Sequence, residues 1–98
     1  MEEKVRVRAW VSGIVQGVFY RSFVEYEANH RNLKGYVRNL ADGRVEVLVE
    51  GERGKIKDLL GELKNYKDYG ARVDSIDVEY GDFKGEFEDF RIKRFRGW

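Results

Sequence analysis

The sequence contains no cysteine and no proline, and histidine occurs once, at His30. The absence of cysteine excludes disulfides, thiolate nucleophiles and cysteine-ligated metal sites. An excess of either charge is also missing, because 19 lysine and arginine residues face 18 acidic residues, for a net charge of +1. Dedicated nucleic-acid or membrane-surface proteins normally carry a one-sided charge, so the sequence predicts neither partner.

Long hydrophobic runs are absent as well. The N-terminal MEEKVRVRAW has no apolar signal core, and no segment approaches the length needed to cross a bilayer. We therefore expect a soluble, cytoplasmic protein. Its 98 residues suffice for one core, so we expect a single domain over residues 1–98, present as a monomer. Dense charge of both signs is typical of thermophilic proteins, although the lack of proline points the other way.

The periodicity of apolar residues predicts the first two elements. Lys4–Ser12 alternates apolar and polar residues, which is typical of a strand with one buried face. Apolar residues then recur at helical spacing, and Gly35 stands where a helix C-cap glycine is expected, so we predict a helix from about Arg21 or Ser22 to Leu33. The expected apolar stripe of this helix is Phe19, Phe23, Tyr26 and Leu33, widened by Val24 and Ala28.

The remaining elements follow by the same reasoning. Asp42-Gly43 is a strong hairpin signal because both residues tolerate positive φ. The expected elements are strands at 36–40 and 45–50, a helix at 55–67, a strand with a bulge at 72–80 and a strand at 87–95. The order is β-α-β-β-α-β plus a short C-terminal strand. This order predicts an α+β, ferredoxin-like split βαβ fold, with an antiparallel sheet and two helices on one face.

The segment Val11–Arg21, VSGIVQGVFYR, joins the first strand to the first helix. A strand, a glycine-containing loop and a helix N-terminus together form an anion site, because loop N–H groups and the helix dipole both favour negative charge. Arg21 can add a planar fork that grips a phosphate. We expect Val15, Val18 and Phe19 to anchor the loop in the core. By periodicity alone, the plain structural interpretation is favoured, in which the glycine serves loop geometry and the arginine lies on the surface.

Two segments carry a family resemblance. SGIVQGVFYRSFVEYEA closely resembles the acylphosphatase signature, whose V-Q-G-V-x-[FY]-R run forms the phosphate-binding loop, and KGYVRNLADGRVEVLVEG is similar to the second signature of that family. The resemblance implies a hydrolase of acyl phosphates that needs no metal and no cofactor. It implies that Arg21 grips the phosphate and that Asn39 holds the attacking water. The implied phosphate cradle comprises backbone amides of Gln16, Gly17, Val18, Phe19 and Tyr20, together with Arg21.

The implied chemistry suits these residues. The leaving group of an acyl phosphate is a carboxylate, so catalysis requires positioning and charge stabilisation rather than a strong general acid. An amide such as Asn39 can accept a hydrogen bond from water but cannot act as a base. Without the resemblance, we would interpret Asn39 as a local capping group of the hairpin. The lone His30 is interpreted as a surface or helix-end residue in either case.

Two alternative functions remain. One is a phosphate- or nucleic-acid-binding module on the same scaffold, for which the basic C-terminal RIKRFRGW is the main support. The other is a relative of the acylphosphatase-like domain in hydrogenase-maturation carbamoyltransferases. We disfavour the second because a chain of this length carries none of the other domains of such an enzyme.

Overall fold

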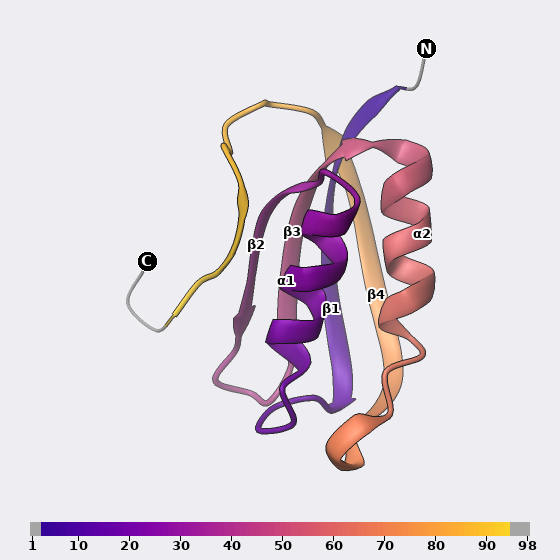
Figure 1. Ribbon diagram of the computed structural model, residues 1–98, viewed down its shortest axis with the longest axis vertical. Coiled ribbons are helices and arrows are strands. Elements are labelled where there is room, and N and C mark those ends of the chain that lie inside the picture. The colour runs from indigo at the N-terminus through magenta and orange to yellow at the C-terminus, as the bar shows by residue number, and fades with distance from the viewer. Residues whose placement is uncertain (1–2, 95–98) are drawn as a thin grey trace.

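The computed structural model describes residues 3–94. Over these residues the chain forms two α-helices and one five-stranded sheet with the strand order β4-β1-β3-β2-β5. Both helices lie on one face of the sheet (Figure 1). The elements are β1 (Lys4–Ile14), α1 (Tyr20–His30), β2 (Lys34–Asn39), β3 (Val45–Glu52), α2 (Arg53–Leu63), a short 3-10 helix (Asp68–Gly70), β4 (Arg72–Asp82) and β5 (Phe90–Ile92). The predicted ferredoxin-like order is confirmed.

The core lies between the sheet and the helices, and strand alternation builds its sheet side. Inward-facing residues of β1 pair with inward-facing residues of β3, as in the pairs of Val7 with Val49 and Ala9 with Val47. All four of these side chains are fully buried. The helix side comes from α2 residues at helical spacing, Ile56, Leu59 and Leu63, and from α1 residues Tyr20, Val24 and Ala28.

The first helix ends earlier than predicted, and its buried stripe is different. The N–H of Leu33 donates to the Ala28 carbonyl and the N–H of Asn32 donates to the Asn29 carbonyl, which together form a Schellman motif. Asn32, with φ 58°, is therefore the left-handed residue that ends the helix. Gly35 lies in β2 instead, where an added Cβ would stand 1.9 Å from the Leu48 carbonyl oxygen. Two residues of the expected stripe, Phe19 and Tyr26, are exposed.

The C-terminal half of the chain corrects the prediction of a wholly antiparallel sheet. β5 is three residues long and pairs with β2 in parallel, so the sheet is mixed. The expected bulge in β4 is confirmed, because the register with β1 steps from Ser75 to Val73 and leaves Asp74 unpaired. The second helix ends at Leu63 rather than at Lys67. The predicted last residue of the fifth strand, Phe95, lies outside the described residues.

The face of the sheet away from the helices is partly covered by the connection between β4 and β5. The carboxylate of Glu50, which is 1% exposed, accepts hydrogen bonds from the backbone N–H groups of Lys84, Gly85 and Glu86 and pairs with Arg6. A buried carboxylate needs such partners to offset its loss of hydration. This contact positions the connection that leads into β5 and thus to one side of the candidate site.

Candidate active site

The loop that follows β1, residues 15–19, is anchored by its apolar side chains. Val15 and Val18 are buried, and so is Tyr20, the first residue of α1. The hydroxyl of Tyr66 donates a 2.7 Å hydrogen bond to the Val18 carbonyl oxygen. The prediction that Phe19 is also an anchor is wrong, because its side chain is 63% exposed and packs against Tyr69 on the surface. Tyr20 takes that place in the core.

The loop turns sharply through two left-handed residues. Gly17 has φ 76° and Phe19 has φ 61°. Nothing lies within 4 Å of a Cβ built on Gly17, so this glycine is required by its backbone conformation rather than by a close neighbour. A left-handed phenylalanine is uncommon, and such backbone strain concentrates at functional sites. Alternation of this kind curls a loop so that successive N–H groups converge, which is the geometry of an anion-binding nest.

The backbone N–H groups of residues 16–21 have no acceptor in the part of the chain that the structure describes. The structure records no hydrogen bond from any of them to an acceptor within residues 3–94. Those of Tyr20 and Arg21 belong to the first turn of α1, where N–H groups have no partner inside the helix. No acidic residue stands in that turn to satisfy them. The loop therefore presents a run of free donors at the positive end of a helix dipole.

Arg21 forms no ion pair with any carboxylate of residues 3–94. Ten arginines fall within the described residues, and eight of them form ion pairs with carboxylates. The two without a partner there are Arg21 and Arg94. Both line a single cavity of about 260 Å³ beside the loop. The other residues that line this cavity are Val15, Gly17, Phe19, Tyr20, Ser22 and Ile92, none of which is acidic.

Gln16 does not line that cavity, and its side chain connects the loop to the β2–β3 hairpin. Its Nε2 atom donates hydrogen bonds of 2.8 and 2.9 Å to the carbonyl oxygens of Leu40 and Arg44. Sequence reasoning missed this connection, since it considered only the backbone amide of Gln16. The two hydrogen bonds bring the loop against the strand end that carries Asn39, as the neighbouring positions of loop and hairpin in Figure 1 show.

Asn39 ends β2 and lies on the helix-covered side of the sheet, two residues after the buried Val37. Its side-chain Oδ1 atom is buried and accepts no hydrogen bond from any described residue. Buried acceptors are nearly always satisfied, and an unsatisfied one costs about 1–3 kcal/mol. An asparagine that caps the hairpin would accept a hydrogen bond at Oδ1 from a nearby backbone N–H. Because this oxygen accepts none from the described residues, the structure does not support the capping role considered above. Asn39 is not among the residues that line the cavity of Arg21.

Other candidate chemistries find little support in the described part of the chain. Within it, no three histidine, aspartate or glutamate side chains gather in a way that could hold a metal ion. His30 is the last residue of α1, is exposed and stacks on Tyr26. None of the helices described is long and apolar enough to span a bilayer.

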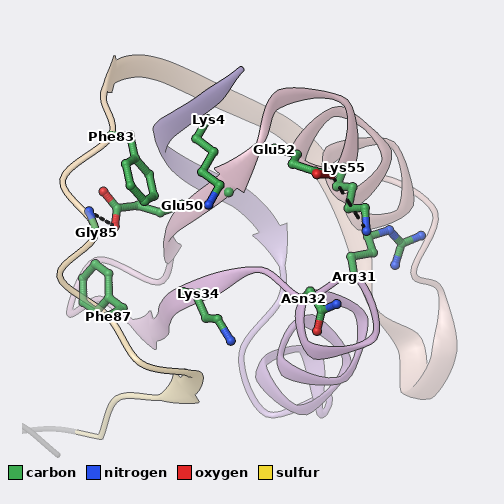
Figure 2. A pocket seen from close by; sticks show the side chains of 11 residues that line it. Lys4, Arg31, Asn32, Lys34, Glu50, Glu52, Lys55, Phe83, Gly85 and Phe87 are labelled. Carbon is green, nitrogen blue, oxygen red and sulfur yellow. Dashed lines mark hydrogen bonds and ion pairs between the residues drawn. The ribbon is translucent and has the colours of Figure 1, made fainter. Parts of the chain in front are cut away.

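A second cavity, of about 370 Å³, lies at the opposite end of the sheet (Figure 2). It is formed where β1 and β2 begin and β3 ends, and Lys4, Lys34 and Phe83 are among the residues around it. No residue of the β1–α1 loop lines it, and neither does Asn39. The predicted phosphate-binding loop and Asn39 therefore lie away from this second cavity.

Comparisons with known proteins agree on one family. The acylphosphatase family model matches residues 7–92. An acylphosphatase from Pyrobaculum islandicum is 41% identical over 91 residues, which cover 92% of this chain and 95% of that protein. The crystal structure of acylphosphatase from Bacillus subtilis superposes with a TM-score of 0.85 at 36% identity, and the match covers 90% of this chain and 97% of that chain.

A longer protein also contains a similar segment. The probable carbamoyltransferase HypF of Methanocaldococcus jannaschii is 46% identical over 91 residues, which cover 91% of this chain. The chain spans only 12% of the length of that protein. The similarity concerns one segment of the carbamoyltransferase and does not extend to the rest of it.

Proposed function

This chain belongs to the acylphosphatase family, and we propose that it hydrolyses acyl phosphates at the β1–α1 loop, with Arg21 and Asn39 as the catalytic residues. The reaction cleaves the carboxyl–phosphate bond and yields a carboxylate and inorganic phosphate. The observation that carries the assignment of the site is the run of unengaged N–H groups over residues 16–21, next to an arginine without a partner among residues 3–94.

The phosphoryl group binds to the amides of Gln16, Gly17, Val18, Phe19 and Tyr20, and to Arg21. Hydrogen bonds from N–H groups and a guanidinium to phosphate oxygens are charge-assisted, and the guanidinium can bind two oxygens at once. The donors are held in place before the substrate arrives, because Val18 and Tyr20 are buried and Gln16 is bound to the hairpin. Preorganised donors stabilise the charge that develops on the phosphoryl oxygens in the transition state.

Asn39 orients the attacking water. Its Oδ1 atom has no partner among the described residues, so it can accept a hydrogen bond from water without giving up another contact. The water oxygen forms a bond to phosphorus while the bond from phosphorus to the acyl oxygen breaks, and the carboxylate leaves with the electron pair. Because the conjugate acid of a carboxylate has a pKa of about 4, the leaving group departs without protonation. The protons of the water end on the inorganic phosphate product.

We further propose that the protein works without a metal or cofactor, as a cytoplasmic monomer that acts on a small molecule rather than on nucleic acid. Two observations support this assignment. The charge of the chain is balanced, and no carboxylate side chain lines the cavity beside Arg21. Purified protein treated with EDTA should remain active, and size-exclusion chromatography with light scattering should give the mass of one chain. Loss of activity with EDTA that returns on addition of a divalent cation would contradict metal independence.

The activity itself is tested with benzoyl phosphate, whose hydrolysis lowers the ultraviolet absorbance. We expect enzymatic hydrolysis that inorganic phosphate inhibits competitively. A folded sample without turnover above the spontaneous rate would overturn the proposal. If that sample instead bound RNA with a steep dependence on salt, the non-catalytic nucleic-acid-binding alternative would replace it.

A further inference from the structure

Arg94 is the second arginine at the cavity of Arg21, and neither family signature includes it. It follows β5 by two residues, and its side chain is exposed. Like Arg21, it has no ion pair with any carboxylate of residues 3–94, although eight other arginines of this region have one. Within residues 3–94, two guanidinium groups at the same cavity thus have no ion pair with a carboxylate.

The backbone before Arg94 is fixed at several points. The carboxylate of Glu25 in α1 accepts a 3.1 Å hydrogen bond from the Ile92 N–H, and the Asn29 side chain donates to the Phe90 carbonyl oxygen. On the other side, the Lys93 N–H donates 2.8 Å to the Val37 carbonyl oxygen of β2. These bonds hold the end of β5 between α1 and β2. Arg94 therefore reaches the cavity from a defined position.

The cavity has room for more than a phosphoryl group. Its volume of about 260 Å³ is close to the lower end of the range of roughly 300–1,000 Å³ for small-molecule sites. In the proposed function, Arg21 and the loop amides already supply the donors for the phosphoryl oxygens. The charge of Arg94 is then available to the acyl part of the substrate, and no acidic side chain lines the cavity to compete for it.

We propose that Arg94 is a specificity-determining residue that selects acyl phosphates with a second anionic group, a carboxylate or a phosphate ester, on the acyl part. This inference rests on the proposed function. Arg94 binds that second group by a charge-assisted contact and takes no part in the bond-breaking step. Because the contact is the same in the bound substrate and in the transition state, it lowers KM and leaves kcat unchanged.

The test compares 3- and 4-carboxybenzoyl phosphate with their carbamoyl analogues, which have the same shape without the charge. Steady-state hydrolysis is measured for the native chain and for Arg94→Gln. Arg94→Lys keeps the charge. Arg91→Gln changes an arginine of β5 that lies outside this cavity, and Lys34→Gln removes a charge at the opposite end of the sheet (Figure 2).

For the native chain we expect kcat/KM to be about three- to tenfold higher for at least one carboxy substrate than for its analogue, the range of a partly screened charge pair. Arg94→Gln should bring this ratio to about one through KM, while the rate with the carbamoyl substrates stays within about twofold. Arg94→Lys should keep most of the preference, and both controls should keep all of it. Added salt should reduce the preference of the native chain.

Two results would overturn the inference. One is a native chain that hydrolyses both substrates without preference, or whose preference survives in Arg94→Gln. The other is an equal loss of both activities in Arg94→Gln, which would place Arg94 at the phosphoryl group or in the fold. A native chain that hydrolyses none of these acyl phosphates would instead refute the proposed function, so the two failures are distinguishable.

Discussion

Gln16 and Leu40 are joined by a 2.8 Å hydrogen bond from the side-chain Nε2 of Gln16 to the backbone carbonyl oxygen of Leu40. The same nitrogen donates to the Arg44 carbonyl oxygen, and Leu40 directly follows Asn39. The loop proposed to bind phosphate and the strand end proposed to hold water are therefore connected by one side chain. Relative positioning of these two groups is the main demand of the proposed reaction.

Gln16→Ala should lower kcat by about tenfold, because it removes two hydrogen bonds worth about 0.5–1.5 kcal/mol each. Inhibition by phosphate should change less, since the loop is still anchored by Val18 and Tyr20. Steady-state kinetics with benzoyl phosphate check both quantities. Gln16→Glu is the matched control, because it keeps the size and replaces the donor with an acceptor that faces two carbonyl oxygens. Turnover at the native rate in both variants would show that the connection is dispensable.

Arg21→Gln should abolish measurable inhibition by phosphate and lower kcat/KM by about 100-fold or more, as the loss of a preorganised charged donor does. The fold should be unaffected, because Arg21 has no partner among residues 3–94 to lose. Circular dichroism and urea unfolding check the fold. Arg53→Gln provides the comparison, since Arg53 pairs with Glu3 far from the loop and its loss should leave kinetics unchanged. Retained inhibition by phosphate in Arg21→Gln would move the phosphate site elsewhere.

Asn39→Ala should lower kcat by about 100-fold and leave inhibition by phosphate unchanged, since Asn39 is proposed to hold water and not the phosphoryl group. The free energy of unfolding should stay within about 1 kcal/mol of the native value, because the substitution removes a buried acceptor that has no partner among the described residues. By contrast, Val37→Ala on the same face of β2 should cost about 1–3 kcal/mol. Near-native turnover in Asn39→Ala would exclude the water-positioning role.

Tyr20 should make the free energy of unfolding depend on pH in the alkaline range. Burial raises the pKa of its hydroxyl above the ordinary value of 10.0, and the hydroxyl donates a 2.9 Å hydrogen bond to the Leu63 carbonyl oxygen. A raised pKa means that the folded state keeps a proton that the unfolded state releases, so its contribution to stability is complete below pH 10 and falls as the pH rises further. Thermal unfolding between pH 9 and 11 should show a shallower decline for Tyr20→Phe than for the native chain. Equal slopes would assign the decline to other groups.

Local pattern accounts for most of the fold. The alternation around Val7 in β1, the spacing of Ile56, Leu59 and Leu63 in α2 and the Asp42-Gly43 turn each predict an element that the structure contains. These signals are reliable because each depends only on which face of a single element is buried. Errors arise where the deciding partner is distant. The end of α1 depends on hydrogen bonds at Asn32, and the short parallel β5 depends on β2, 55 residues earlier at the pair of Gly35 and Phe90.

The sequence by itself determined the family and the order of the elements, and it predicted Arg21 and Asn39 as the catalytic residues, because two long segments match the family signatures in both spacing and residue type. Only the tertiary structure decided what surrounds them. It placed Phe19 on the surface and Tyr20 in the core, left Asn39 Oδ1 without a partner among the described residues, and brought Arg94 to the cavity of Arg21. The physical reason is that pairing, burial and the absence of a partner depend on residues far apart in the chain, which come together only when the sheet forms.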